Sequence, residues 1–180
     1  MNTKTKQKFS AKDLTRMAVF AALMAICSWI SIPATVPFTL QTMGVFLAVG
    51  ILGGRRGTLS IIVYVLLGAI GLPVFAGFSG GLGGTASGYI VGFVFSALVM
   101  WAIEHFFGNG IPVLAVSMVI GLIVCYAFGT AWFYVAYTSA NGAVTLMSVL
   151  GWCVIPFIIP DLIKIGCALL LTARLRKYVG

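Results

Sequence analysis

The chain has 180 residues, of which 61% are hydrophobic and only 8% charged, whereas soluble globular proteins are about 25% charged. A water-soluble fold of this length would leave far too much apolar surface exposed, so the composition excludes one and predicts an all-α integral membrane protein. The net charge of +8 does not indicate nucleic-acid binding, because the basic residues gather at the two ends and at one Arg-Arg pair, as membrane orientation signals do.

The first element combines a basic N-terminal tail, residues 1–11, with an apolar run from Met17 to Ile32. A secretory signal peptide has an apolar core of about 7–15 residues, followed by a cleavage site. Here the run is longer and leads directly into further apolar sequence. We therefore expect a cytoplasmic tail followed by a retained membrane span at roughly 12–32.

Five more apolar segments follow, and a helix needs about 20 residues to cross the hydrocarbon core. Pro156 and Pro160 interrupt the last segment, and a proline in a helix interior removes a backbone hydrogen bond. The sequence thus predicts a single six-helix membrane domain over residues 1–180. In chain order, the five segments lie at roughly 40–54, 57–72, 86–107, 111–137 and somewhere within 147–173.

The distribution of basic residues predicts the orientation of these spans. All Lys and Arg residues except Lys164 lie before or at the start of the first span, between the second and third spans at Arg55 and Arg56, or after the sixth span. With an even number of spans, these three places fall on one side of the membrane. The positive-inside rule then predicts a multi-pass protein of the cytoplasmic membrane with both termini in the cytoplasm. The loops expected on the opposite side contain no Lys or Arg, around 33–41, 73–86 and 138–147.

The segment 71–93, between the third and fourth spans, contains eight glycines in 23 residues and no charge. Non-helical backbone at membrane depth is tolerated only where protein covers it or where it lines a cavity. Glycine adopts φ values that other residues rarely reach, so we expect an apolar re-entrant lid with its backbone close to a ligand. A packing connector without a ligand is the alternative. Close helix packing at the start of the fourth span is expected from glycines spaced by four, at Gly80, Gly84, Gly88 and Gly92.

Few residues in these segments are suited to catalysis or metal binding. Asp13 is expected to be a solvated residue or to lie at a helix start, and Glu104 with His105 is expected to form an interfacial pair at the end of the fourth span. No GxxxxGK[ST], HExxH or GxSxG motif occurs, and the single histidine cannot build a catalytic triad. We therefore expect no catalytic residue, no metal site and no cofactor, and the protein is not expected to be an enzyme. The cysteines lack CxxC spacing and are expected to be small buried hydrophobic residues, at Cys27, Cys125, Cys153 and Cys167.

The sixth segment contains an ion pair in apolar surroundings, Asp161 and Lys164 of IIPDLIKIGCALLL. Their i, i+3 spacing puts both on one helix face, and counting back from Arg174 places Asp161 about 20 Å from the cytoplasmic edge. Ionisable side chains at such depth cost at least ~2.5 kcal/mol to insert, and they are kept where they face the bundle interior with a partner. Pro160 suits the first turn of a helix, where the dipole favours Asp161. The pair either locks the bundle together or lines a pocket for a small polar solute.

Several stretches, in order along most of the chain, carry a family likeness. They are PFTLQT at 37–42, GRRGTLS at 54–60, VYVLLGAIGLPVFAG at 63–77 with Tyr64, SGYIVGF at 87–93 and IPDLIK at 159–164. On these residues the sequence resembles the BioY family, the biotin-binding substrate (S) components of energy-coupling factor (ECF) transporters. One departure is TAS at 85–87, where the family is expected to have a Pro-Thr-Gly-like turn.

The resemblance implies an S-component fold of six membrane helices with both termini inside. The vitamin site would lie near the outer face, under the loops that join helices 1–2 and 3–4. The implied function is high-affinity biotin binding and uptake without ATP hydrolysis by this subunit, in association with a membrane coupling subunit and two cytoplasmic ATPase subunits. Such proteins are described as toppling in the membrane to deliver the substrate. Small alanines of helix 1 pack on the coupling subunit, and the matching pairs here are Ala18 with Ala22 and Ala21 with Ala25.

The chemistry of biotin suits the ion pair, because its ureido ring offers two N–H donors and one strong acceptor. We expect Asp161 to accept a ureido N–H and Lys164 to donate to the ureido oxygen. Aromatic side chains would cover the thiophane ring and the aliphatic tail, and a serine with glycine N–H groups would hold the valerate carboxylate. The opposite pose, with Lys164 on the carboxylate, stays open. The expected ligand-binding residues are Asp161, Lys164, Tyr89, Phe75, Gly77, Phe78 and Ser79.

Three other functions also stay open. An S component for another vitamin, such as thiamin or riboflavin, would share the fold, although Lys164 disfavours cationic thiamin. A membrane enzyme that uses Asp161 and Lys164 as acid and base would lack a third polar group. A purely structural membrane subunit would need neither side chain for a ligand.

Overall fold

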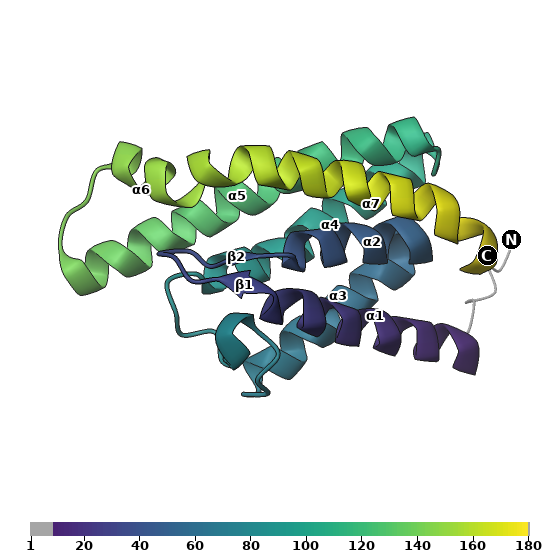
Figure 1. The fold of residues 1–180 in the computed structure, drawn as a ribbon, viewed down its shortest axis with the longest axis horizontal. Coiled ribbons are helices and arrows are strands. Elements are labelled where there is room, and N and C mark those ends of the chain that lie inside the picture. Colours follow the sequence, from purple (N-terminus) through teal and green to yellow (C-terminus); the bar gives the residue numbers. More distant parts are fainter. Residues whose placement is uncertain (1–8, 180) are drawn as a thin grey trace, which may run out of the picture.

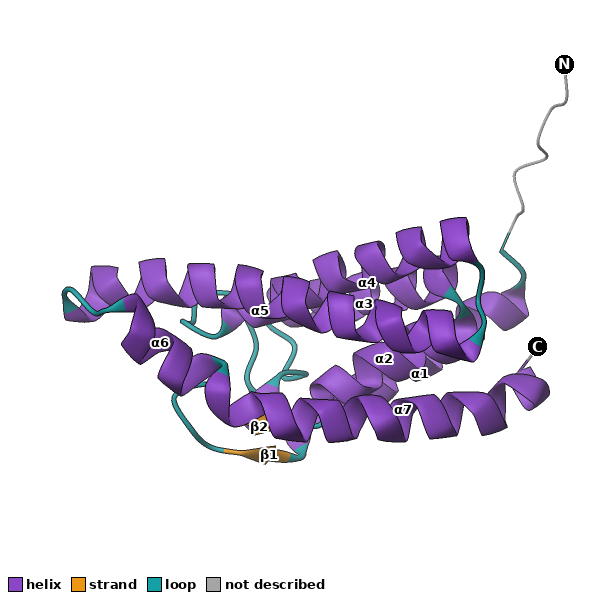
Figure 2. Cartoon of the chain, turned by 90° about the horizontal axis from the view of Figure 1, so that it is seen from above, coloured by secondary structure: helices purple, strands orange, loops and turns teal. Residues whose placement is uncertain are grey.

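The computed structural model describes residues 9–179, which form a bundle of helices aligned roughly along one axis (Figures 1 and 2). Residues 1–8 of the predicted basic tail lie outside the described residues. Two-residue strands β1 (Ser31–Ile32) and β2 (Phe38–Thr39) form an antiparallel hairpin that was not predicted, and the other elements are helices, as expected. The α-helices are α1 (Ala11–Trp29), α2 (Gln41–Leu52), α3 (Gly54–Ala69), α4 (Ser87–Phe107), α5 (Ile111–Asn141), α6 (Leu146–Cys153) and α7 (Ile158–Val179).

Six helical segments correspond to the six expected spans. Helices α1 to α5 begin and end within a few residues of the predicted boundaries, and α6 with α7 forms the sixth segment. Three stretches are long and apolar enough to cross a membrane by themselves, whereas α2, with 12 residues, is shorter. The chain is therefore an all-α membrane protein. The three stretches are Ser87–Phe107, Ile111–Asn141 and Leu146–Tyr178.

The sixth segment is broken where the two prolines lie. Helix α6 ends at Cys153, and Pro156 lies in the short 3-10 helix η2 (Ile155–Phe157) that follows. Pro160 lies at the start of α7, where its missing N–H has no helical partner to lose. The break therefore starts a new helix directly before Asp161, which lies in its first turn.

One end of the bundle contains both the start of α1 and the end of α7. The first turn of α1 and the last turn of α7 lie at the same end in both ribbon views, as an even number of spans requires (Figures 1 and 2). The turn between α2 and α3 reverses the chain at Gly53, whose φ of +81° favours glycine. Arg55 and Arg56 lie in the first turn of α3 and not in a loop, because α3 begins earlier than predicted, at Gly54.

Two of the three acidic residues stabilise helix starts at this end. Asp13 and Ser10 form a capping box at the start of α1, and Asp13 also pairs with Arg56 at 3.1 Å. The expectation that Asp13 lies at a helix start is thus confirmed. Glu104 accepts a hydrogen bond from the backbone N–H of Gly54, so it links the end of α4 to the start of α3. This contact gives Glu104 a capping role beyond the interfacial pair that was predicted.

Glycines allow α4 to pack closely against α5. A Cβ at Gly88 would lie 2.2 Å from the Trp132 side chain, and a Cβ at Gly92 would lie 3.3 Å from α5. The smooth face expected at the start of the fourth span is therefore confirmed for these two glycines. Gly80 and Gly84 precede α4 and belong to the loop before it.

The crossing of α2 and α3 gives a first prediction. A Cβ at Gly57 would lie 2.6 Å from the Cα of Val49, and a backbone atom cannot move aside as a flexible side chain can. Gly57→Ala is therefore expected to lower the free energy of unfolding by about 1–3 kcal/mol, read as a lower thermal midpoint in detergent. Gly166→Ala is the matched control, since a Cβ there meets nothing within 4 Å. Equal midpoints for the two variants would contradict the prediction.

Candidate ligand-binding site

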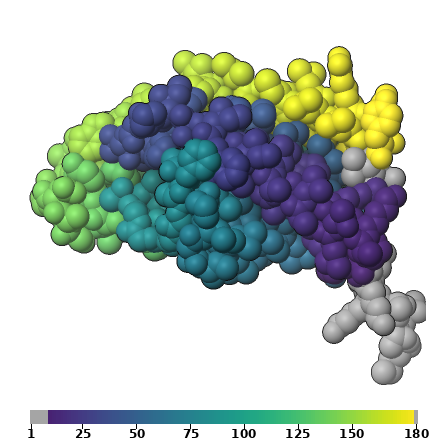
Figure 3. Space-filling model, turned by 60° about the horizontal axis from the view of Figure 1, so that its bottom comes forward, coloured from purple at the N-terminus to yellow at the C-terminus, as the bar shows by residue number. Residues whose placement is uncertain are grey.

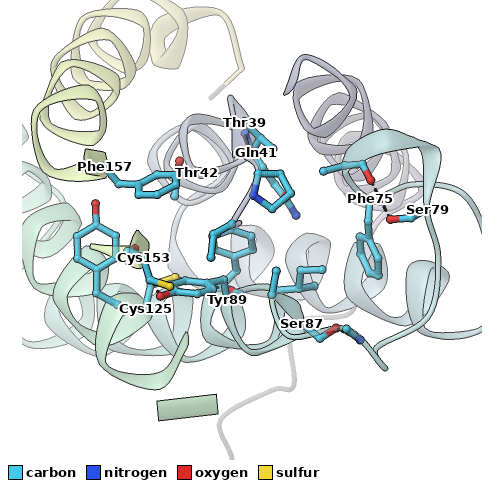
Figure 4. A pocket seen from close by; sticks show the side chains of 18 of the residues that line it. Thr39, Gln41, Thr42, Phe75, Ser79, Ser87, Tyr89, Cys125, Cys153 and Phe157 are labelled. Atoms are coloured by element: carbon cyan, nitrogen blue, oxygen red, sulfur yellow. Dashed lines mark hydrogen bonds between the residues drawn. The ribbon is translucent and has the colours of Figure 1, made fainter. Parts of the chain in front are cut away.

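A partly open cavity of about 550 Å³ lies among the loops and helix ends opposite the start of α1. Its walls come from the loop before α2, the start of α2, the lid (residues 71–86), α4, α5 and the segment 153–164. Figure 4 shows Phe75 and Ser79 of the lid on one side, and Cys125, Cys153 and Phe157 on the other. Most of this wall is apolar or neutral, and its charged members are Asp161 and Lys164.

The ion pair of Asp161 and Lys164 is buried in the wall of this cavity. The two side chains meet at 2.7 Å, and their residues are 2% and 6% exposed. Thr42 Oγ1 donates to Asp161 Oδ1 at 3.1 Å and accepts from Lys164 Nζ at 3.3 Å. The Tyr126 hydroxyl donates to Asp161 Oδ2 at 2.5 Å. Lys164 Nζ also lies 4.6 Å from the centre of the Phe38 ring, so the ammonium gains a cation–π contact.

This arrangement leaves hydrogen-bonding capacity for a ligand. A carboxylate has about four acceptor sites and an ammonium has three donors. Asp161 accepts three hydrogen bonds, and Lys164 Nζ donates two. One acceptor site on Asp161 Oδ2 and one donor of Lys164 therefore remain, so the pair has the capacity to bind a group that presents an N–H and a C=O.

Local structure explains why these residues meet. Asp161 lies in the first turn of α7, where the helix dipole favours a carboxylate, and Lys164 follows one turn later on the same face. Thr42 lies in the first turn of α2, which packs against α7. Tyr126 comes from α5, so three helices hold the pair.

Tyr89 of α4 lines the cavity with its ring and directs its hydroxyl into the protein. The hydroxyl lies 3.0 Å from Thr130 Oγ1 and 3.5 Å from the carbonyl oxygen of Cys153. A Cβ at Gly129 would lie 2.2 Å from the ring, so this glycine makes room for it. Because the hydroxyl is already bonded, the part of Tyr89 that remains for the cavity is its apolar ring.

A second polar network ties α2 to the lid. Gln41 Nε2 donates to the Tyr64 hydroxyl at 2.8 Å, and that hydroxyl donates to the carbonyl oxygen of Val74 at 3.0 Å. The Phe75 ring packs edge-on against Tyr64 with centroids 5.6 Å apart. A Cβ at Gly68 would lie 2.0 Å from this ring, so Phe75 occupies space that only glycine leaves open. The position of the lid therefore depends on side chains of α2 and α3.

The outside of the lid is anchored to the end of α1. Trp29 Nε1 donates to the carbonyl oxygen of Pro73 at 3.0 Å, and its ring stacks on Phe78 with centroids 5.0 Å apart. In the space-filling view the teal lid lies beside the dark blue segment that follows α1 (Figure 3). Gly77 and Phe78 have φ values of +68° and +55°, and Phe78 is 64% exposed. The chain therefore turns Phe78 outward, while the next residue, Ser79, lines the cavity.

The structure gathers most, but not all, of the predicted ligand-binding residues. Gly77 and Phe78 are not part of the cavity wall, and Phe78 packs on Trp29 instead of covering the cavity. Sequence reasoning missed Thr42 and Gln41, although both lie in the quoted PFTLQT stretch, and it missed Tyr126, which no local pattern distinguishes. The predicted residues that do line the cavity are Asp161, Lys164, Tyr89, Phe75 and Ser79.

The alanine pairs of α1 face in different directions. Ala18 and Ala22 are exposed on the outer surface of the bundle. Ala21 and Ala25 are only 5% and 6% exposed, and they pack inside the core. In this structure only the Ala18–Ala22 pair is available to a partner, so the expected contact surface is narrower than the sequence suggested.

Comparison with known proteins agrees with the fold and with the resemblance seen in the sequence. A family model described as BioY family matches residues 1–180. The chain is 40% identical over 170 residues to "Biotin transporter BioY" of Thermotoga maritima, covering 92% of this chain and 96% of that protein. It is 37% identical over 172 residues to "Probable biotin transporter BioY" of Pyrococcus horikoshii, covering 92% and 97%.

A solved structure of similar fold supports the same family resemblance. The chain superposes with a TM-score of 0.81 and 28% identity on the S-component for biotin from an ECF-type ABC transporter, covering 98% of this chain and 95% of that one. The helices described above therefore form the S-component fold. From the family match over its whole length and from these relatives, the chain belongs to the BioY family.

Proposed function

We propose that this protein binds biotin in the cavity and is the substrate-specific subunit for its uptake across the cytoplasmic membrane in an ECF-type transporter. The observation that carries the proposal is the buried ion pair with one acceptor and one donor left over. A ureido ring presents an N–H beside a C=O, which matches this pair. Two relatives are named as biotin transporters, and the solved neighbour is an S-component for biotin.

In the proposed pose, Asp161 accepts a ureido N–H and Lys164 donates to the ureido oxygen. Phe75 and Tyr89 contact the apolar rings and tail, and Ser79 lies near the carboxylate. This pose keeps the bond between Asp161 and Lys164 intact. Moving Lys164 to the carboxylate would instead leave the carboxylate of Asp161 buried with only hydroxyl partners, which is costly.

The proposed orientation places both termini in the cytoplasm, with residues 1–180 forming one membrane domain and residues 1–11 its basic tail. The positive-inside rule supports it, because the described basic residues other than Lys164 lie in the first two turns of α1, the first turn of α3 or the last two turns of α7. The cavity then opens toward the outside. Uptake against a gradient needs an energy source, and we assign this to a membrane coupling subunit and two ATPase subunits.

Biotin titration into the purified full-length protein in lipid nanodiscs, followed by calorimetry, tests the ligand. One-to-one saturable binding, without binding of thiamin or riboflavin at the same concentrations, is the expected result. A folded protein that binds one of those vitamins and not biotin would overturn the assignment. Uptake of labelled biotin with and without co-expressed coupling and ATPase subunits tests the partners.

A substitution on the exposed face of α1 separates binding from uptake. Ala22→Trp is expected to leave biotin affinity unchanged but to reduce ECF-dependent uptake by about tenfold or more, because a bulky ring prevents close helix approach. Ala131→Trp, on the exposed face of α5, is the matched control and is expected to retain uptake. Equal uptake by the two variants would argue against α1 as the contact surface.

A further inference from the structure

We propose that the site recognises its ligands by the ureido ring and does not discriminate between charged and neutral tails. It therefore also binds uncharged carboxyl derivatives of biotin. This inference rests on the proposed function and concerns the part of the ligand that the ion pair does not hold. It defines the ligand class as ureido bicycles with an extended tail that ends in an anionic or a neutral polar group.

The first observation is the charge balance of the cavity. Its wall contains one carboxylate and one ammonium, 2.7 Å apart, and their charges cancel. Every other residue of the described wall has an uncharged side chain at neutral pH, including those that carry a hydroxyl or thiol group. An anionic ligand therefore meets no net positive charge, and its own charge adds little to the attraction.

The second observation is that, among residues 9–179, no charged side chain lines the lid side of the cavity. Ser79 Oγ already donates to the carbonyl oxygen of Ala76 at 2.8 Å, and Ser87 Oγ accepts from the N–H of Gly84 at 3.0 Å. The N–H of Gly81 is bonded to the carbonyl oxygen of Gly68 at 2.7 Å. The remaining groups are neutral hydroxyls and glycine amides, which can bond to an amide or ester oxygen as well as to a carboxylate.

The third observation concerns the loops around the mouth of the cavity. The loops around the mouth, residues 30–40, 70–86 and 142–145, contain no Asp, Glu, Lys or Arg. Burying a carboxylate without a charged partner costs free energy, and this cost is avoided where water reaches the group. The tail of the ligand must therefore end at the open mouth, where a carboxylate, an amide or an ester is solvated alike.

Competition binding to the full-length protein in nanodiscs tests the inference with three ligands. Biotinamide, whose tail is neutral, is expected to bind within about tenfold of biotin, because its missing charge has no partner. 2-Iminobiotin, which replaces the ureido oxygen, is expected to bind at least about 100-fold more weakly, because it removes the acceptor that Lys164 needs. Biotin binding with a loss of more than about tenfold for biotinamide would overturn this inference and leave the proposed function intact.

A gain-of-charge variant tests the same point from the protein side. Ser79→Lys places an ammonium at an exposed position of the lid that faces the mouth. It is expected to raise the preference for biotin over biotinamide by about two- to fivefold, the size of an exposed ion pair. Ser79→Gln, which is long but neutral, is the comparison: because Ser79 lines the site, it can weaken binding, but the change is expected to be similar for biotin and biotinamide. If the wild type already prefers biotin to biotinamide and Ser79→Lys does not increase this preference, a cation elsewhere in the protein binds the carboxylate, and the inference is overturned.

Absence of biotin binding by the folded protein would overturn the proposed function and this inference together.

Discussion

Biotin affinity is expected to fall by at least about 100-fold in Lys164→Met, because truncating one member of a buried charge pair costs several kcal/mol. Lys164 donates to Asp161 and to Thr42, and it is the proposed donor to the ureido oxygen. Without it, Asp161 remains as a buried carboxylate with only the hydroxyls of Thr42 and Tyr126 as partners. The free energy of unfolding should also fall by about 3–5 kcal/mol. Calorimetry and thermal unfolding in detergent measure the two effects.

The double variant Asp161→Asn/Lys164→Met separates binding from stability. Removing both charges leaves no uncompensated ion, so stability is expected to recover most of what Lys164→Met loses. Biotin binding should stay weak, since the donor to the ureido oxygen is absent and an amide oxygen is a weaker acceptor than a carboxylate. A double variant that binds biotin like wild type would show that the pair only holds the bundle together.

A second large effect is expected from one added methyl group at Gly68. In Gly68→Ala the new Cβ would lie 2.0 Å from the Phe75 ring, so the ring must leave its position in the cavity wall. Phe75 is packed against Tyr64, whose hydroxyl bonds to the lid at Val74. Displacing the ring therefore displaces the lid, and biotin affinity is expected to fall by about 10- to 100-fold. Calorimetry measures the loss.

A second-site change checks that Phe75 is the cause of this loss. Adding Phe75→Leu to Gly68→Ala replaces the clashing ring with a smaller side chain and is expected to recover part of the affinity. Gly166→Ala, which adds the same methyl group where a Cβ meets nothing, should bind like wild type. If the double variant binds no better than Gly68→Ala, the loss arises in α3 and not in the lid.

Hydropathy and charge were sufficient to predict most of the fold. A span is a long apolar run, and the break in the sixth run coincides with Pro156 and Pro160, whose effect on helices is local. The start of α3 was predicted too late, because Arg55 and Arg56 were treated as a loop, whereas Glu104 caps the helix at Gly54. The β1–β2 hairpin has two residues in each strand, too few for an alternating pattern to be visible.

Site residues could be predicted from the sequence when their charge contrasts with apolar neighbours. Asp161 and Lys164 are charges in an apolar run, so they were identified directly. Thr42 and Tyr126 are ordinary members of membrane helices, and their role arises only when α2 and α5 pack against α7. Phe78 resembles Phe75 in sequence, yet its φ of +55° turns it outward. In the same way, only the rotation of α1 about its axis decides which alanines are exposed.

The neutral ion pair has an electrical consequence. A charge that crosses a membrane potential changes its energy by about 2.3 kcal/mol per 100 mV. Asp161 and Lys164 move as one unit with no net charge, since they are three residues apart on one helix and bonded at 2.7 Å. Moving the empty cavity wall along the field therefore requires no work on a net charge, and only turning the short dipole of the pair costs a small amount of electrical energy. When biotin occupies the site, the field acts there on the charge of the ligand alone.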